Sequence, residues 1–134
     1  NIIVTPHMKE MSRLTGIQIE EMKENPVRTA REFADQYGVV CVLKDAATVI
    51  AGRDGKTFVN GSGTPAMAKG GSGDVLTGVI AGLVALGLEE SDAAALGVYV
   101  HGLAGEAAEK HFGVHGVLAG EIADCLPEVY RDGI

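Results

Sequence analysis

The sequence has few cysteines, and those present form no redox or metal motif. Only Cys41 and Cys125 occur among 134 residues, one in a strand-like run and one in a helical run. There is no C-x-x-C pair, and no histidine stands at ligand spacing. This pattern predicts two buried free thiols rather than a disulfide or a redox pair.

Histidines are also sparse. His111 and His115 flank Gly113 in a predicted turn, but no carboxylate or third ligand accompanies them in the sequence. Because a zinc site takes three or four protein ligands, we predict no metal-ligating residues. His101, in the middle of a helical segment, is expected to be a core or interface residue.

Positive charge is scarce as well. Eleven Lys and Arg residues stand against eighteen Asp and Glu residues, which gives a formal net charge of −7. The basic residues are spread singly, so no basic stripe is available to neutralise a nucleic-acid backbone, and we predict no nucleic-acid partner. A small anionic ligand remains compatible where local N–H groups and one or two lysines outweigh the general negative field.

Long apolar runs are missing too. The longest uncharged run, residues 75–88, is too short to span a bilayer and contains three glycines. With no signal-peptide pattern, the sequence predicts a cytoplasmic protein without membrane contact. At 134 residues and 46% hydrophobic composition, one globular domain is expected. Because the chain opens directly on a strand without an initiator Met, we expect residues 1–134 to be a single but partial domain.

Strand and helix patterns alternate along the chain, which indicates an α/β fold. The continuous apolar run at 39–43 is typical of a strand buried on both faces in a parallel sheet. A D-G turn at 54–55 predicts a β-hairpin between 48–51 and 57–60. Another short strand is expected at 2–4. Helices are expected at 8–14, at 18–37 with Pro26 at a first helical position, after 74, at 93–112 with Ser91 or Asp92 as N-cap, and at 118–130, where Pro127 favours a kink.

A glycine-rich loop that leads into an apolar helix dominates the middle of the chain. At its centre are Gly70, Gly71, Ser72 and Gly73, whose small side chains leave backbone N–H groups free to approach an anion. A helix N-terminus adds partial positive charge, so this loop is a predicted phosphate site. Asp74 follows at once. It is either a helix N-cap or a base that takes a proton from a substrate hydroxyl, and the length of the loop favours the base.

Two further positions stand where predicted strands end, the edge at which open α/β sheets bind ligands. Lys44 follows the buried run and, with Thr48, is a candidate for binding phosphate oxygens. The sequence favours equally the alternative that the Lys44 side chain extends from the sheet edge into solvent. His7 follows the strand at 2–4. For His7 the alternative is a loop histidine hydrogen-bonded to backbone.

These residues together resemble a known enzyme family. Thr5-Pro6-His7 with Glu10, Leu43-Lys44 with Thr48, and GTPAMAKGGSGDVLTG at 63–78 are similar to the ADP/ATP-dependent NAD(P)H-hydrate dehydratases of the ribokinase-like superfamily. The resemblance covers nearly the whole chain. One departure is Thr64, which stands where many members have Asn.

The resemblance implies a ribokinase-like three-layer α/β/α sandwich on a mainly parallel sheet, with the N-terminal part missing. It implies ADP or ATP as co-substrate, with Mg²⁺ accompanying the nucleotide, and a fused or separate NAD(P)H-hydrate epimerase domain. Asp74 would be catalytic and would meet the substrate together with His7 and Thr64. The nucleotide and its phosphates would be bound by Lys44, Asp45, Ala46, Ala47, Thr48, Gly70, Gly71, Ser72 and Gly73.

Two other functions fit the same residues. A ribokinase-like kinase acting on a vitamin-precursor alcohol would need the same loop and aspartate, although Thr5-Pro6-His7 and the Pro65-Ala66-Met67-Ala68 segment speak against it. The other possible function is that of a nucleotide-binding module without catalytic activity. Small residues along the helix at 93–112 also suggest a homo-oligomer.

Overall fold

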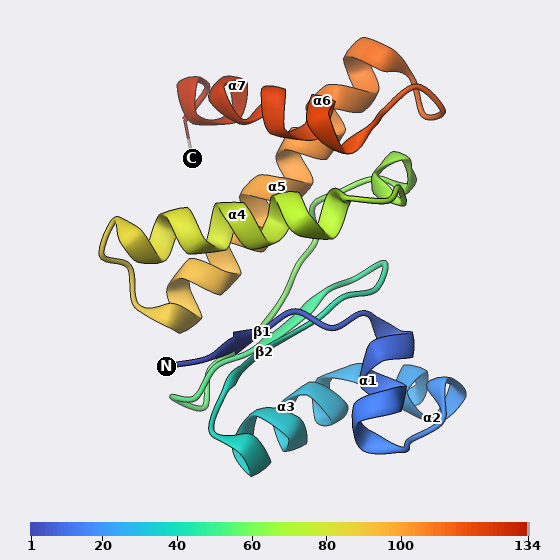
Figure 1. Ribbon diagram of the computed structural model, residues 1–134, viewed down its shortest axis with the longest axis vertical. Helices are drawn as coiled ribbons and strands as arrows, with labels where there is room; N and C mark the ends of the chain where they lie inside the picture. The colour runs from blue at the N-terminus through green and yellow to red at the C-terminus, as the bar shows by residue number, and fades with distance from the viewer. Residues whose placement is uncertain (134) are drawn as a thin grey trace. The chain divides into compact units, whose positions relative to one another are not determined.

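The structure, a computed structural model, describes residues 1–133 and contains two compact units (Figure 1). The sheet unit comprises Asn1–Asn60 and Leu88–Ala95. The helical unit comprises Gly61–Gly87 and the chain from Leu96 onward. Helix α5 (Glu90–Phe112) contributes its first residues to the sheet unit and the rest to the helical unit. No helix among the described residues is both long enough and apolar enough to cross a membrane.

The sheet unit has the predicted α/β composition, and its sheet is mixed. Strand β2 pairs with β1 in parallel, whereas the pairs β2–β3 and β3–β4 are antiparallel. The strand order is β1-β2-β3-β4. The elements are β1 (Ile3–Val4), α1 (Met8–Thr15), α2 (Ile19–Glu24), α3 (Pro26–Tyr37), β2 (Val40–Leu43), β3 (Val49–Ala51) and β4 (Thr57–Val59).

Local sequence signals account for most of these boundaries. The Asn25 side chain accepts a hydrogen bond from the Arg28 amide at 3.0 Å and so caps α3, which begins at Pro26 as predicted. Gly38, with φ of 63°, ends the same helix. The predicted hairpin is confirmed, since Ala51 pairs with Thr57 across the D-G turn.

The core of the sheet unit lies between the sheet and α1–α3, which cover one of its faces (Figure 1). All four residues of β2 are buried, as the continuous apolar run predicts. Cys41 is one of them, and burial raises the pKa of its thiol to about 12, which keeps it protonated and unreactive at neutral pH.

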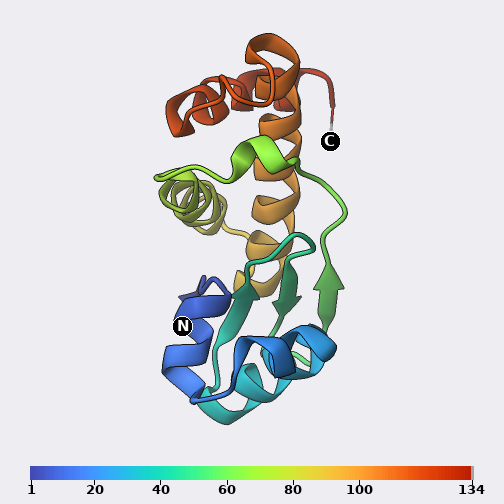
Figure 2. The ribbon, with the colours of Figure 1, turned by 90° about the vertical axis from the view of Figure 1, so that its right-hand side faces the viewer.

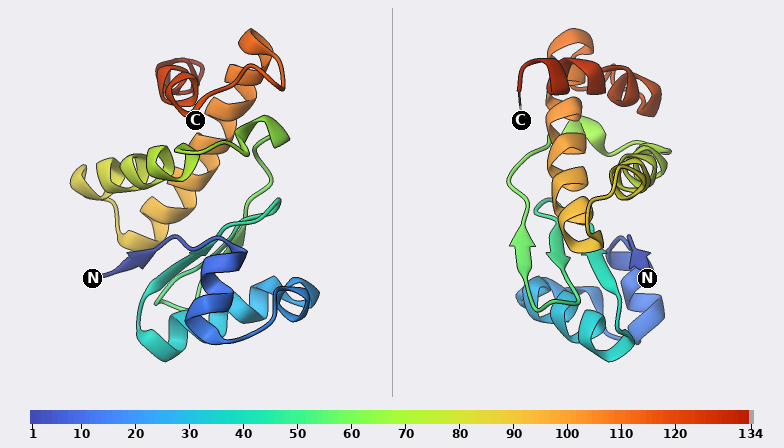
Figure 3. Two further views of the ribbon diagram at one scale, coloured as in Figure 1. Left: turned by 45° about the vertical axis from the view of Figure 1, so that its right-hand side comes forward. Right: turned by 90° about the vertical axis from the view of Figure 1, so that its left-hand side faces the viewer.

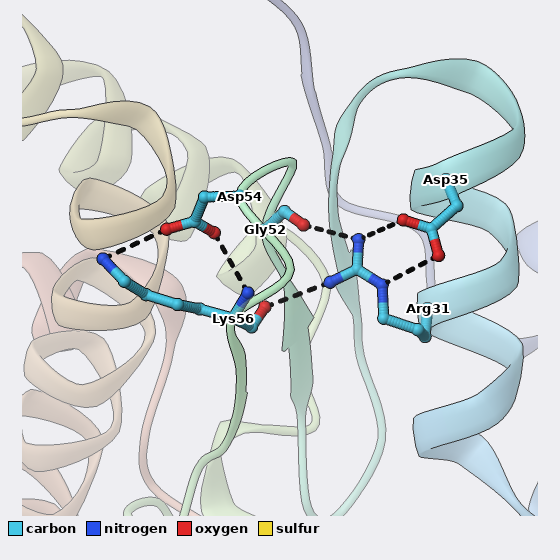
Figure 4. Close-up of polar contacts among 5 residues, drawn as sticks. All are labelled: Arg31, Asp35, Gly52, Asp54 and Lys56. Carbon is cyan, nitrogen blue, oxygen red and sulfur yellow. Dashed lines mark hydrogen bonds and ion pairs between the residues drawn. The ribbon is translucent and has the colours of Figure 1, made fainter.

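One arginine ties α3 to the β3–β4 hairpin (Figure 4). The guanidinium of Arg31 donates to the carbonyl oxygens of Gly52 at 2.5 Å and Lys56 at 3.2 Å, while Asp35 on α3 holds its other edge at 2.7 Å. The Arg31 side chain is only 21% exposed. A planar fork of this kind satisfies several acceptors at once, which a lysine cannot reproduce.

The helical unit contains η1 (Pro65–Met67), α4 (Ser72–Ala85), most of α5, α6 (Ala119–Asp124) and α7 (Leu126–Arg131). Its buried cluster is built from α5, α6 and α7 together with Ala66 and Val117. The last predicted helix is interrupted at Cys125, just before Pro127, where a proline is tolerated only in a first helical turn.

The prediction that Ser91 or Asp92 caps α5 is wrong, because the helix already begins at Glu90. Glu89 instead accepts a hydrogen bond from the Ser91 amide at 3.2 Å, so the residue before the helix satisfies a free N–H of its first turn.

Helices α4 and α5 cross closely at a glycine (Figure 3). A Cβ atom on Gly97 would lie 2.7 Å from Cγ1 and 3.4 Å from Cα of Ile80. The two backbones therefore approach to a distance that no larger residue at position 97 allows.

We expect Arg31→Ala to lower the free energy of unfolding by about 1.5–3 kcal/mol, the range for hydrogen bonds to charged groups. Urea denaturation measures this. Arg28→Ala is the matched control: Arg28 lies on the same helix, and its ion pair with Glu32 is largely exposed, with 71% of the Arg28 side chain accessible. Equal effects of the two substitutions would show that the bonds to the hairpin carbonyls contribute nothing.

Two glycine substitutions should shift stability in opposite directions. Gly97→Ala overpacks the α4–α5 crossing and should cost about 1–3 kcal/mol. Gly82 lies inside α4, and a Cβ atom added to it would meet no other atom within 4 Å, so Gly82→Ala should raise stability by about 0.5–1 kcal/mol through helix propensity. Thermal unfolding of both variants is the measurement; stabilisation by Gly97→Ala would contradict the close approach.

Candidate functional site

The glycine loop forms the start of α4, as the sequence predicts. Gly71 is the N-cap residue with φ of 89° and ψ of −14°, a left-handed conformation that favours glycine. A Cβ on Gly71 would also lie 3.1 Å from the Cβ of Ala119. The backbone angle therefore favours glycine at this point, and the space beside it is tight for a larger residue.

Backbone donors remain free at this helix start. Among the described residues, the N–H groups of Gly70, Gly71 and Gly73 have no hydrogen-bond partner. Neighbouring amides are occupied, since Ser72 donates to the Lys69 carbonyl at 3.3 Å and Asp74 to the Gly71 carbonyl at 3.1 Å. Free N–H groups at the positive end of a helix can bind an anion, and the phosphates of a nucleotide are groups of the kind that such donors bind.

Asp74 lies in the first turn of α4, after Ser72 and Gly73. The alternative that it serves only as an N-cap is wrong, because Gly71 holds that position. Its side chain is exposed, and within the described part of the chain its carboxylate has no hydrogen-bond or ion-pair partner. An unpartnered carboxylate beside free amides can accept a proton from a bound hydroxyl.

Ser72 is placed differently from its glycine neighbours. Its hydroxyl is buried and lies 3.4 Å from Nε2 of His101, which is itself only 7% exposed. The expectation that His101 is a core residue is confirmed. Since the hydroxyl and the amide of Ser72 are both engaged, Ser72 positions the loop in this geometry, and its direct phosphate contact stays a prediction.

Helix α5 holds the loop that precedes the glycines. Glu106 accepts from the Gly63 amide at 2.8 Å, and Glu109 accepts from the Thr64 hydroxyl. Gly102 leaves room for this loop, because a Cβ there would lie 2.9 Å from the carbonyl carbon of Ser62. Sequence reasoning missed both glutamates; their spacing of three residues on one helix face was the only available signal.

In the sheet unit, His7 caps α1. Its Nδ1 accepts from the Glu10 amide at 3.1 Å, and the Glu10 carboxylate accepts from the His7 amide at 2.8 Å. This hydrogen bond matches the second interpretation of His7 given above, a loop histidine hydrogen-bonded to backbone. The backbone bond from His7 lowers the pKa of Glu10 below its ordinary value. Because Nδ1 accepts, the neutral ring carries its proton on Nε2, and the side chain is 49% exposed.

The structure brings His7 and Lys44 together. They form a parallel β-bridge, and the Lys44 amide donates to the Pro6 carbonyl at 2.8 Å. An open pocket of about 460 Å³ adjoins this edge. It is lined by Val4, Thr5, Pro6, Glu10, Arg13 and Leu14.

The residues after Lys44 make a short exposed turn. Asp45, Ala46 and Ala47 are exposed, and Thr48 closes the turn by donating from Oγ1 to the Asp45 carbonyl at 3.3 Å. The candidate residues thus fall into two groups, one around His7 and Lys44 in the sheet unit and one around Gly70–Asp74 and Thr64 in the helical unit.

Comparison with known proteins assigns the family. The family model described as NAD(P)H-hydrate dehydratase matches residues 1–128 of this chain. The chain belongs to this family. A bifunctional NAD(P)H-hydrate repair enzyme Nnr of Moorella thermoacetica is 45% identical over 131 residues, which are 98% of this chain and 25% of that protein.

Other members of the NAD(P)H-hydrate dehydratase family also match this chain, in sequence and in structure. An ADP-dependent (S)-NAD(P)H-hydrate dehydratase of Bacillus subtilis is 39% identical over 97% of this chain and 47% of its own length. The crystal structure of the ADP/ATP-dependent NAD(P)H-hydrate dehydratase from Bacillus subtilis, co-crystallised with ATP/Mg²⁺, matches with a TM-score of 0.92 at 39% identity. That match covers 97% of this chain and 47% of the solved one.

A ribokinase-like superfamily protein of Enterococcus faecalis matches with a TM-score of 0.83 at 33% identity, over 97% of this chain and 44% of that one. The fold of this NAD(P)H-hydrate dehydratase family member is therefore ribokinase-like, as the sequence predicts. The chain spans about half the length of the dehydratases that it matches and a quarter of the bifunctional enzymes.

Proposed function

We propose that this chain belongs to an enzyme that returns the hydrated forms of NADH and NADPH to NAD(P)H. The reaction consumes ADP or ATP and releases phosphate with AMP or ADP. The observation that supports this most is the set of free amides at the start of α4, next to the unpartnered carboxylate of Asp74. Relatives named as dehydratases of this substrate cover nearly the whole chain.

The proposed reaction uses a nucleotide because the hydroxyl group of the substrate is a poor leaving group. The hydrate carries a hydroxyl on the reduced nicotinamide ring, and hydroxide does not leave readily. Asp74 accepts the hydroxyl proton while the oxygen attacks the terminal phosphorus of the nucleotide, and the bond from that phosphorus to its bridging oxygen breaks. The Gly70, Gly71 and Gly73 amides stabilise the negative charge on the transferring group. The ring nitrogen then assists departure of phosphate, and loss of a ring proton restores NAD(P)H.

Other residues have supporting roles in this proposal. Lys44 and the turn from Asp45 to Thr48 bind the nucleotide, whereas His7 and Thr64 contact the hydrated dinucleotide. Mg²⁺, when bound with the nucleotide, neutralises phosphate charge, and phosphate oxygens and water are the ligands it prefers. The Bacillus subtilis relative was crystallised with ATP/Mg²⁺.

Two partners belong to the same proposal. Several relatives are named as bifunctional repair enzymes, so an epimerase domain acting on the same damaged cofactor is a fitting neighbour. The small residues of α5 suggest a homo-oligomer.

The function is tested by incubating the full-length protein with hydrated NADH or NADPH and either ADP or ATP. Recovery of reduced-nicotinamide absorbance, with release of inorganic phosphate, supports dehydration. A stable phosphorylated alcohol would instead support the kinase alternative. Nucleotide binding without either product would support the module without catalysis.

Asp74→Asn should reduce turnover in this assay by about 10²–10⁴-fold, the usual contribution of a positioned base. Nucleotide binding, measured by calorimetry, should remain. Asp124→Asn is the matched control, since it removes the same charge from an exposed residue on α6. Unchanged turnover in Asp74→Asn would remove this residue from the reaction.

Lys44→Ala should weaken ADP or ATP binding by about 1.5–3 kcal/mol, the range for a charge-assisted hydrogen bond. Lys110→Ala, which removes an exposed lysine from the end of α5, serves as the control for net charge. Calorimetric titration of both variants with ADP and with ATP measures the two affinities. Equal affinities would show that the Lys44 ammonium group lies in solvent when the nucleotide is bound.

A further inference from the structure

A second group of reactive side chains lies in the helical unit, apart from the residues of the candidate dehydratase site. His111 is in the last turn of α5, Cys125 links α6 to α7, and Glu128 is on α7. One potential ligand atom from each of these three residues lies within 4.8 Å of the other two. Helices α6 and α7 lie across the C-terminal end of α5 (Figure 2), which brings residues far apart in sequence together.

Cys125 lies on the buried side of this group. The Cys125 amide donates to the Glu121 carbonyl at 3.1 Å, and Cys125 is 7% exposed within the cluster that includes Ile122 and Val129. His111 and Glu128 close the outer side, where Nε2 and Oε2 are 3.0 Å apart and the side chains are 54% and 35% exposed. One face of the group is therefore buried and the other open to water.

The electrostatics around Cys125 favour a cation. Glu128, Asp124 and Glu121 place three negative charges around Cys125. These carboxylates attract a divalent metal ion. A metal that binds here takes the place of the thiol proton, which passes to solvent.

We propose that His111, Cys125 and Glu128 bind a zinc ion, with water as the fourth ligand. Imidazole nitrogen, thiolate sulfur and carboxylate oxygen are the donors that Zn²⁺ takes in proteins, in tetrahedral geometry. Ligand atoms in such a tetrahedron are about 3.5 Å apart. In this structure His111 Nε2 and Glu128 Oε2 are 3.0 Å apart, and all three ligand atoms lie within 4.8 Å of one another. Side-chain rotations that move these atoms by about 1 Å would therefore produce the tetrahedral spacing.

Zinc binding removes the proton of the Cys125 thiol and moves the ring proton of His111. The Cys125 S–H bond breaks as the S–Zn bond forms. In the metal-free structure the His111 Nε2 faces the Glu128 carboxylate at 3.0 Å and donates to it in the neutral ring, so the proton moves to Nδ1 when Nε2 binds the metal. The ion would connect the end of α5 to the junction of α6 and α7 and stabilise these helices. This role is independent of the proposed dehydratase reaction.

The test uses the reduced full-length protein with every affinity tag removed, and Co²⁺ as a spectroscopic probe for Zn²⁺. Wild type should show the ligand-field bands of tetrahedral cobalt and a thiolate-to-cobalt charge-transfer band. One equivalent of Zn²⁺ should abolish both, whereas excess Mg²⁺ should not, because Mg²⁺ prefers six oxygen ligands. Cys125→Ser should remove the charge-transfer band, and Cys41→Ser, the matched control at the buried thiol of β2, should keep it.

A second pair of variants avoids any loss of folding caused by changes in the core. His111→Ala alters an exposed side chain and should weaken Zn²⁺ binding by at least about 10-fold, the smallest loss typical even of outer-shell partners. His115→Ala, at another exposed histidine in the following turn, should leave the affinity unchanged. Failure of wild type to bind Zn²⁺, or equal binding by wild type and His111→Ala, would overturn the proposal.

Discussion

The left-handed turn at Gly71 is the constraint on which the helical unit depends. With φ of 89° at this residue, the chain can leave the loop and enter α4 with the amides of Gly70, Gly71 and Gly73 unpaired. A Cβ atom at position 71 would lie 3.1 Å from the Cβ of Ala119 on α6, so a larger residue has little room at the turn. The anion site proposed at this helix start, in a protein whose net charge is −7, therefore relies on fixed backbone dipoles rather than on a surplus of basic side chains.

A single helix supports that turn at several points. His101 contacts Ser72 at the first position of α4, and farther along α5 Glu106 and Glu109 hold the loop at Gly63 and Thr64. Glycines on α5 permit this, because any Cβ at position 97 or 102 would collide with the segments that pack there. Gly97 and Gly102 are thus used for packing within the helical unit.

Local signals in the sequence were sufficient for much of this architecture. The Asn25-Pro26 helix start, the D-G hairpin and the glycine loop each depend on backbone preferences of adjacent residues, so they could be predicted without a structure. The contacts of Glu109 with Thr64 and of Glu128 with His111 join residues 45 and 17 positions apart. No periodicity encodes such pairs. The same reason explains why His111 and His115 looked like an incomplete site, since the sulfur and the carboxylate near His111 come from later helices.

The hydrogen bonds already made at the two predicted substrate contacts restrict what each can offer a ligand. The Thr64 hydroxyl donates its proton to Glu109 and accepts weakly from the Ala66 amide at 3.4 Å, so its remaining capacity is that of an acceptor. His7 is also engaged, because Nδ1 accepts from the Glu10 amide and Nε2 lies 3.4 Å from the Glu10 carboxylate. Without rearrangement, a ligand that contacts the Thr64 hydroxyl must therefore present a donor to it. An Asn at position 64 could supply a donor as well as an acceptor, so the threonine of this chain offers fewer kinds of hydrogen bond at this point of the loop.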